Sequence, residues 1–341
     1  MESTGAQQQL FQHIKGLLPA HISMVDEVAD LLNISNDSAY RRIRGEKPID
    51  LEEIKKLCSH YKISLDQLLH LNSDSFLFSG RITNNTDFTF ENWLQACGEV
   101  LEMVSSHQPN HIYYLAKEIP FFYYFLLPEI AAFKSFFFMK SILYYEDWKH
   151  AKFSVTDDYS KYHEKWNNIS NKFAAIPGTE IWSIENITST IHQIEFYRAT
   201  GAIPSDEDAL ILFDRFDDLI NHLEKQAEYG VKLRYGQMNA DGRPAYKMYV
   251  NELIMGDNMH LVQVGNMQLT YINHSVINFI VTRDPAFNAY MKRTLDVIAQ
   301  KSTPISEVNE KERLMFFNRL RAKVKAAKHR IASNTSPTIW S

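Results

Sequence analysis

The sequence between residues 25 and 43 constrains the fold more than any other stretch. Four apolar residues recur there at the spacing of one helix face: Val25, Val28, Ala29 and Leu32. Asn33 follows, and asparagine ranks second to glycine in the left-handed conformation that commonly ends a helix. Ser35 can cap a second helix, whose inward face carries Ala39 and Ile43. The pattern predicts two short helices joined by a turn over residues 33–35.

Further helices are expected on both sides of this pair. Residues 7–18 are amphipathic and precede Pro19. Asp50 with Glu53, and Ser64 with Gln67, have the spacing of a capping box. Together these features predict a small all-α domain with a helix-turn-helix at its centre.

Residues 7–71 resemble a phage-repressor-type (XRE-type) helix-turn-helix DNA-binding domain. The matching elements are "VADLLNIS" and "SAYRRIRGEKPIDLEEIKKLCSHYKISLDQLL", with Asn33 where glycine is commoner in that family. The resemblance covers about a fifth of the chain. It implies that helix 35–44 enters the major groove of double-stranded DNA.

The DNA-binding candidates all lie on or beside that helix. They are Ser35, Asn36, Asp37, Ser38, Tyr40, Arg41, Arg42, Arg44 and Lys47. Asn36, Ser38, Tyr40 and Arg41 are predicted to face base edges, and Arg42, Arg44 and Lys47 to contact phosphate. Arginine suits either task because its planar fork can bond bidentately to guanine or to phosphate. Asp37 also faces outward, and a carboxylate is not an obvious fit beside DNA.

Charge favours a local rather than a global attraction to DNA. The chain carries a formal net charge of -5, and residues 1–71 hold eight basic and ten acidic side chains. Residues 40–48 hold four bases and one acid, so the local balance is +3. Binding would therefore depend on this patch. Two alternatives stay open: the arginines form a solvated face with Glu46 and Asp50 as partners, or the domain binds protein instead of DNA.

The rest of the chain predicts a second, larger domain. We place a linker at residues 72–89, which are rich in Asn, Ser, Thr and Asp, and an α+β effector or dimerisation domain at 90–341. Residues 158–230 favour three helices broken at "IPGTE" and "ATGAIPSDED", and alternating runs after residue 231 favour strands. The predicted fold class is mainly α, with an N-terminal helix-turn-helix domain followed by a larger α+β domain.

Two helices of the second domain offer surfaces for a homodimer. One has five residues at a/d spacing: Phe90, Leu94, Cys97, Leu101 and Val104. The other, at residues 311–330, has eight bases against one acid above an apolar seam. The first is either a core helix or a dimer seam. The second is a solvated helix, a dimer contact or an auxiliary phosphate contact.

Several function classes are disfavoured. Two cysteines exclude a disulfide framework, and the N-terminus lacks a signal-peptide pattern, so a cytoplasmic protein is expected. The longest uncharged run of the aromatic segment, 119–128, is too short to cross a membrane. Nucleotide-binding, hydrolase and metalloprotease motifs are absent, so we expect no catalytic residues, no metal and no cofactor.

The sequence thus favours a DNA-binding transcriptional regulator that acts as a homodimer, with no enzyme activity. Its second domain would dimerise, sense a small-molecule or protein effector, or do both. Two alternatives stay open: an adaptor that binds protein through the helical domain, and an enzyme with an appended DNA-binding module.

Overall fold

A computed structural model describes residues 5–18, 22–61, 63–69, 76–80, 88–237, 239–253 and 256–333, and for residues 66 and 67 the backbone alone. The chain divides into two compact units, Met1–Leu77 and Phe78–Ser341. Most of the predicted linker lies outside the described residues. The roles of the helix-turn-helix domain, of the linker at 72–89 and of the domain at 90–341 stay predictions.

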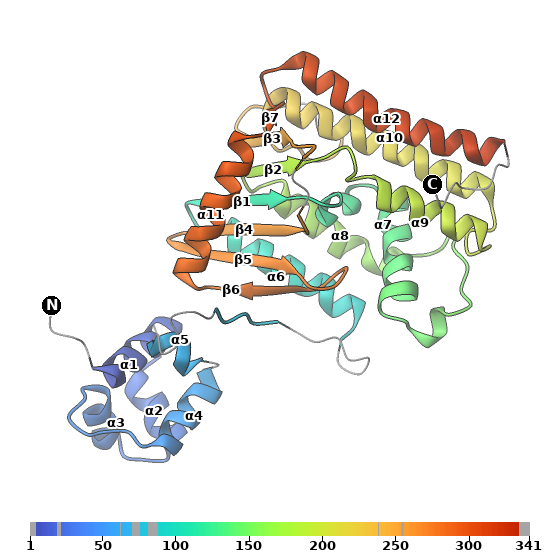
Figure 1. Cartoon of the computed structure of the whole chain (residues 1–341). Coiled ribbons are helices and arrows are strands. Elements are labelled where there is room, and N and C mark those ends of the chain that lie inside the picture. The colour runs from blue at the N-terminus through green and yellow to red at the C-terminus, as the bar shows by residue number, and fades with distance from the viewer. Residues whose placement is uncertain are drawn as a thin grey trace. The chain divides into compact units, whose positions relative to one another are not determined.

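The first unit is built from helices (Figure 1). They are α1 (Ala6–Leu17), α2 (Met24–Leu32), α3 (Asn36–Ile43), α4 (Leu51–Tyr61) and α5 (Leu65–Leu69). Its core holds the side chains that the apolar stripes place inward: Leu10, Phe11, Ile14, Val28, Ala29, Leu32, Ala39 and Leu57. The helical N-terminal region therefore agrees with the expectation.

The second unit is organised around a seven-stranded mixed sheet with the order β6-β5-β4-β1-β2-β3-β7. The strands are β1 (Asn110–Leu115), β2 (Gly178–Trp182), β3 (Tyr246–Val250), β4 (Met259–Val264), β5 (Met267–Asn273), β6 (Phe279–Thr282) and β7 (Thr303–Pro304). β1, β2 and β3 run parallel, and the remaining neighbours pair antiparallel. The parallel strands are separated by helical segments, as a crossover connection requires.

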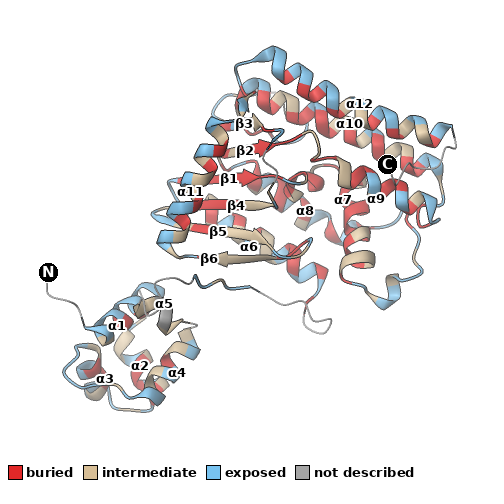
Figure 2. Ribbon diagram, in the orientation of Figure 1, coloured by how far each residue is buried: buried red, intermediate tan, exposed pale blue. Residues whose placement is uncertain are grey.

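Helices cover both faces of this sheet (Figures 1 and 2). The helical segments are α6 (Phe90–Ser105), η1 (Phe121–Leu126), α7 (Pro128–Phe137), η2 (Phe138–Ile142), η3 (Glu146–Trp148), α8 (Ser160–Phe173), α9 (Thr188–Ala199), α10 (Asp206–Tyr229), α11 (Pro285–Gln300) and α12 (Glu310–Ala332). Met291, Leu295 and Ile298 of α11 pack on one face against Leu115 and Leu261. The larger, aromatic-rich core lies on the opposite face. A sheet-containing second region is therefore confirmed in outline.

Strands β2, β6 and β7 were not predicted, and the failure at β2 has a clear physical reason. The break that we placed at "IPGTE" contains the start of β2, which pairs with both β1 and β3. Five residues, Gly178–Trp182, form it, and four of them are buried. A strand covered on both faces shows no polar–apolar alternation, so the period-2 signal is missing.

Of the two interpretations of α6, a core helix or a dimer seam, the structure supports the core helix for most of the residues. Phe90, Leu94, Leu101 and Val104 are at most 2% exposed and belong to the unit's own core. The apolar seam of α12 is likewise buried, and α12 packs along α10. Neither helix offers its apolar seam to a second copy. Within the described residues, no helix combines the length and the hydrophobicity that a membrane crossing needs.

A buried lysine in α7 gives the second unit an unusual dependence on pH. Lys134 is 1% exposed, and its ammonium donates to the hydroxyl of Thr190 at 3.1 Å and to the amide oxygen of Gln193 at 2.8 Å. The nitrogen also lies 4.2 Å from the ring centroid of Tyr124. Burial lowers the pKa of Lys134 to about 8, and the charge of Glu118 opposes this shift.

Stability should therefore rise between about pH 8 and pH 10 through Lys134. In that window the folded chain has lost the proton, while the unfolded lysine, with a pKa of about 10.4, still binds it. The free energy of unfolding of the wild type should gain about 2 kcal/mol relative to Lys134→Met between pH 7.5 and pH 10. Urea unfolding followed by tryptophan fluorescence measures this, since all five tryptophans follow residue 78. Parallel pH profiles for the two proteins would contradict it.

Candidate nucleic-acid interface

The turn between α2 and α3 has the predicted geometry. Asn33 ends α2 with φ 56° and ψ 53°, and its backbone N–H donates to the carbonyls of Ala29 and Asp30. The side-chain oxygen of Ser35 accepts from the backbone N–H of Ser38 at 3.3 Å. The left-handed residue and the N-cap are both confirmed, and they fix the direction in which α3 leaves the turn.

The outward side of α3 carries the residues that the helical spacing places there. Asp37, Tyr40, Arg41 and Arg44 are all exposed, and Tyr40 keeps 47% of its surface accessible. A guanidinium nitrogen of Arg44 donates to the hydroxyl of Tyr40 at 3.0 Å, and the guanidinium lies 5.5 Å from the Tyr40 ring centroid. This bond raises the pKa of Arg44. In the described part of the chain, the side chain of Arg41 makes no hydrogen bond or ion pair.

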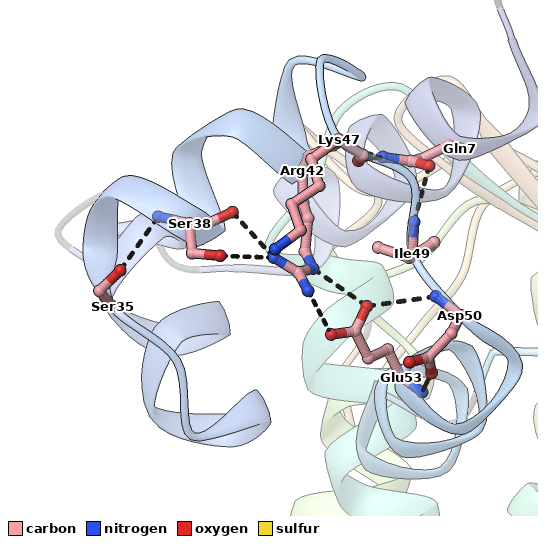
Figure 3. A network of polar contacts seen from close by, with 8 residues as sticks. All are labelled: Gln7, Ser35, Ser38, Arg42, Lys47, Ile49, Asp50 and Glu53. Carbon is pink, nitrogen blue, oxygen red and sulfur yellow. Dashed lines mark hydrogen bonds and ion pairs between the residues drawn. The ribbon is translucent and has the colours of Figure 1, made fainter.

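Arg42 does not belong to that outward side, which corrects its predicted role in phosphate contact (Figure 3). Its residue is 7% exposed. Its Nε donates to Glu53 Oε2 at 3.0 Å and its Nη2 to Glu53 Oε1 at 2.7 Å, a bidentate pair that joins α3 to α4. Its Nη1 donates to the hydroxyl of Ser38 at 2.5 Å. The guanidinium is therefore used inside the unit.

The inward position of Arg42 follows from the helical period. Ala39, Arg42 and Ile43 stand at i, i+3 and i+4, so all three share the face that packs against the other helices. The inward position of Arg42 could therefore be predicted from the helical period. The resemblance to a DNA-binding helix led instead to a predicted phosphate contact.

Gln7 is a structural residue that the sequence reasoning missed. Its side-chain amide nitrogen donates to the carbonyls of Arg42 and Lys47 at 2.7 and 2.8 Å, and its oxygen accepts from the N–H of Ile49 at 3.1 Å. These bonds attach α1 to the segment between α3 and α4. A single glutamine in an amphipathic helix gives no pattern from which such contacts could be predicted.

A capping box supports the same network from α4. Asp50 accepts from the N–H of Glu53 at 2.8 Å, and Glu53 accepts from the N–H of Asp50 at 3.2 Å, as predicted. Glu53 thus caps its own helix and pairs with Arg42 from a single carboxylate. Breaking the pair would disturb both contacts.

The nine predicted residues separate into two groups. Ser35, Ser38 and Arg42 have their polar side-chain atoms engaged in capping or in the contact with Glu53. The second group is Asn36, Asp37, Tyr40, Arg41, Arg44 and Lys47, all of them exposed. Asn36 donates to Asp26 Oδ1 at 2.8 Å, an exposed bond that a stronger partner can replace. The structure brings the second group together along one side of α3 and the following loop.

The local charge is smaller than the sequence count suggested. Arg42 is neutralised by Glu53, which leaves Arg41, Arg44 and Lys47 as exposed bases. Glu46 lies 3.3 Å from Arg44, and both side chains are about half exposed. This surface ion pair is weak enough to open when a phosphate competes.

The second predicted basic surface, on α12, is largely neutralised within its own unit. Five of its bases form ion pairs: Arg319 with Glu252, Arg321 with Glu224, Lys323 with Glu185, Lys328 with Asp214 and Asp217, and Arg330 with Glu195. Arg313 is buried and donates to the backbone carbonyls of Ile305 and Val308. The auxiliary phosphate contact loses its support because most of the charge is already compensated.

Comparison with known proteins bears on the first unit. No curated protein and no solved structure matches the chain. Residues 12–87 match the sequence model of the BetR domain. This is a family of helical, DNA-binding-like domains, and the match points to a regulatory DNA-binding role for this part of the chain.

Proposed function

We propose that this protein is a DNA-binding transcriptional regulator that inserts α3 into the major groove. The observation that carries the proposal is the exposed side of α3, where Tyr40, Arg41 and Arg44 project from a helix fixed by a left-handed turn and an N-cap. Such a frame holds side chains at base edges with little loss of conformational freedom on binding. The BetR match supports the same role.

The exposed residues divide by chemistry. Arg41, which has no partner among the described residues, is the strongest candidate for a bidentate contact to guanine. Asn36, at the start of α3, suits adenine once it leaves Asp26. Arg44 and Lys47 lie at the other end, where phosphate contacts position a recognition helix. Asp37 can accept a hydrogen bond from the amino group of cytosine, which gives this carboxylate a role beside DNA.

The proposal includes a homodimer on a two-part site. One small domain with three exposed bases in this region gives few contacts, and specific helix-turn-helix proteins usually double them by two-fold symmetry. The surface that would join two copies is not one of the two helical seams considered above. An effector for the second unit is part of the same proposal.

Removing the two arginines tests the interface directly. Arg41→Ala/Arg44→Ala should weaken binding to a DNA fragment selected by the wild-type protein about 100-fold, since each such contact contributes about 1 to 3 kcal/mol. The salt dependence should also become shallower: the slope of log K against the logarithm of the salt concentration should fall in magnitude by about 0.9 per lost phosphate contact. Fluorescence anisotropy over a salt series measures both quantities.

The matched control is Lys55→Ala/Lys56→Ala, which removes two exposed positive charges from α4 of the same unit. This control should keep most of the affinity. Equal losses in the two double variants would show that overall charge, rather than the side of α3, holds DNA. A wild-type protein that shows no salt-dependent DNA binding would favour the adaptor instead.

A further inference from the structure

The second unit contains a cavity of about 410 Å³. Trp93, Ala96 and Cys97 of α6 line one side, and His260, Tyr271 and Phe279 of β4, β5 and β6 line the sheet side. This volume lies within the range of small-molecule sites in proteins. The cavity is formed entirely by residues of the second unit.

The chemistry of the walls selects an uncharged occupant. Aromatic and aliphatic side chains make up most of the lining, and no Asp, Glu, Lys or Arg of the described residues contributes to it. A charged ligand would lose its hydration without gaining an ionic partner, at a large cost in free energy. A flat, aromatic, neutral molecule fits these walls best because rings stack favourably on rings.

His260 supplies a polar group that the protein itself leaves unused. Its residue is 6% exposed, and its Nδ1 is buried without a hydrogen-bond partner among the described residues. The imidazole is stacked between Tyr114 and Tyr271, with ring centroids 5.2 and 4.8 Å away. These three residues face one another across β1, β4 and β5 by strand register. Nδ1 has no accessible surface, so an occupant of the cavity meets another edge of the imidazole, and no described residue forms a hydrogen bond with either ring nitrogen.

Burial also keeps this ring neutral. It lowers the pKa of His260 to about 3, so one ring nitrogen donates and the other accepts at neutral pH. A hydroxyl group complements either tautomer, since it can donate or accept.

The chain that enters the second unit forms part of the cavity wall. Ser79 pairs with Val281 of β6 through two backbone hydrogen bonds of 2.8 Å, and Gly80 follows. A Cβ at Gly80 would lie 2.7 Å from a methyl carbon of Ile280, so only glycine allows this close approach. An occupant would therefore touch the stretch that directly follows the first unit.

We propose that this cavity binds a small, neutral aromatic molecule whose hydroxyl group forms a hydrogen bond with the imidazole of His260. The site belongs to the second unit alone, so it is independent of whether α3 binds DNA. It assigns a ligand class to a part of the chain for which the BetR match gives none.

Two probes of nearly equal shape test the hydrogen bond. 2-Naphthol should bind the full chain about tenfold more tightly than 2-methylnaphthalene, because only the hydroxyl can form a hydrogen bond with the imidazole of His260. His260→Phe keeps a flat ring in the stack and should remove this preference. Equilibrium dialysis measures both affinities. A protein that binds neither probe, or a preference that survives in His260→Phe, would overturn the proposal.

A pair of substitutions on α6 tests the location. Ala96→Phe fills the cavity and should abolish binding of 2-naphthol, whereas Gln95→Phe places the same ring on the exposed side of the helix and should leave binding intact. Unchanged binding in Ala96→Phe would contradict the assigned site.

A measurement without a core substitution covers the case in which Ala96→Phe fails to fold. In a Cys58→Ser chain, the only remaining thiol is Cys97, which lines the cavity. Saturating 2-naphthol should slow alkylation of Cys97 by iodoacetamide at least fivefold. An unchanged rate at saturation would place the probe elsewhere and overturn the proposal.

Discussion

Replacing Lys232 with methionine should lower the free energy of unfolding of the second unit by about 3 to 5 kcal/mol, because it leaves the carboxylate of Glu180 buried without its counter-charge. Both side chains are 1% exposed, and Lys232 Nζ lies 2.5 Å from Glu180 Oε1. Burial lowers the pKa of Lys232 from its usual value, and the charge of Glu180 opposes that shift. The pair is thus held together in a medium that penalises either charge alone.

The surroundings of this pair complete its hydrogen bonding. Tyr123 donates to Glu180 Oε1 at 2.7 Å, while Trp182 and Tyr246 donate to Oε2 at 2.8 and 3.0 Å. The ammonium of Lys232 lies 4.0 Å from the ring centroid of Phe173 and 4.5 Å from that of Tyr246. The neutral donors lie on η1, β2 and β3, so the network ties these three elements to one carboxylate.

Urea unfolding followed by tryptophan fluorescence measures the loss in the second unit, because no tryptophan precedes residue 78. Lys247→Met removes an exposed lysine from β3 and should change the free energy of unfolding by less than about 0.5 kcal/mol. The double variant Glu180→Gln/Lys232→Met removes both charges and should recover part of the loss. If Lys232→Met were as stable as Lys247→Met, the buried pair would contribute nothing.

The sequence predicted those features that depend on neighbours along the chain. Asn33 and Ser35 act within a few residues of themselves, so their roles at the turn could be identified in advance. The helices 158–230 were likewise visible because local periodicity sets them. Contacts between distant residues carry no such signal: Lys232 and Glu180 are 52 residues apart, and nothing near either one indicates the other.

In α3 too, features set by neighbouring residues were predicted, whereas a contact with a distant residue was not. The exposed positions of Asp37, Tyr40, Arg41 and Arg44 follow from the 3.6-residue period, and the structure places all four outward. The assignment of Arg42 failed because three clustered arginines were considered as one surface. Its partner, Glu53, is 11 residues away on α4. The predicted capping box already gave Glu53 a role there, so no second partner was sought. Sequence spacing alone does not reveal that the carboxylate of Glu53 both caps α4 and pairs with Arg42.

Arg42→Ala should therefore act on stability rather than on DNA contact. It leaves Glu53 mostly buried without its cation, and we expect the first unit to lose about 3 kcal/mol. The two side chains are 8% and 14% exposed, so solvent screens the pair little. Arg42→Lys should restore the charge without the bidentate geometry, and therefore only part of the stability.

Hydrogen exchange of the full chain, measured by mass spectrometry, separates the two roles. In Arg42→Ala the backbone amides of α3 and α4 should exchange about 100-fold faster, since about 1.4 kcal/mol corresponds to a factor of ten in the open population. Arg41→Ala removes the neighbouring arginine from the exposed side and should leave exchange unchanged while weakening DNA binding. Normal exchange in Arg42→Ala together with weakened DNA binding would return Arg42 to the interface. Faster exchange in Arg42→Ala with unchanged DNA binding, together with the reverse in Arg41→Ala, would establish different roles for the two adjacent arginines. Arg42 would stabilise the fold of the first unit, and Arg41 would contact DNA.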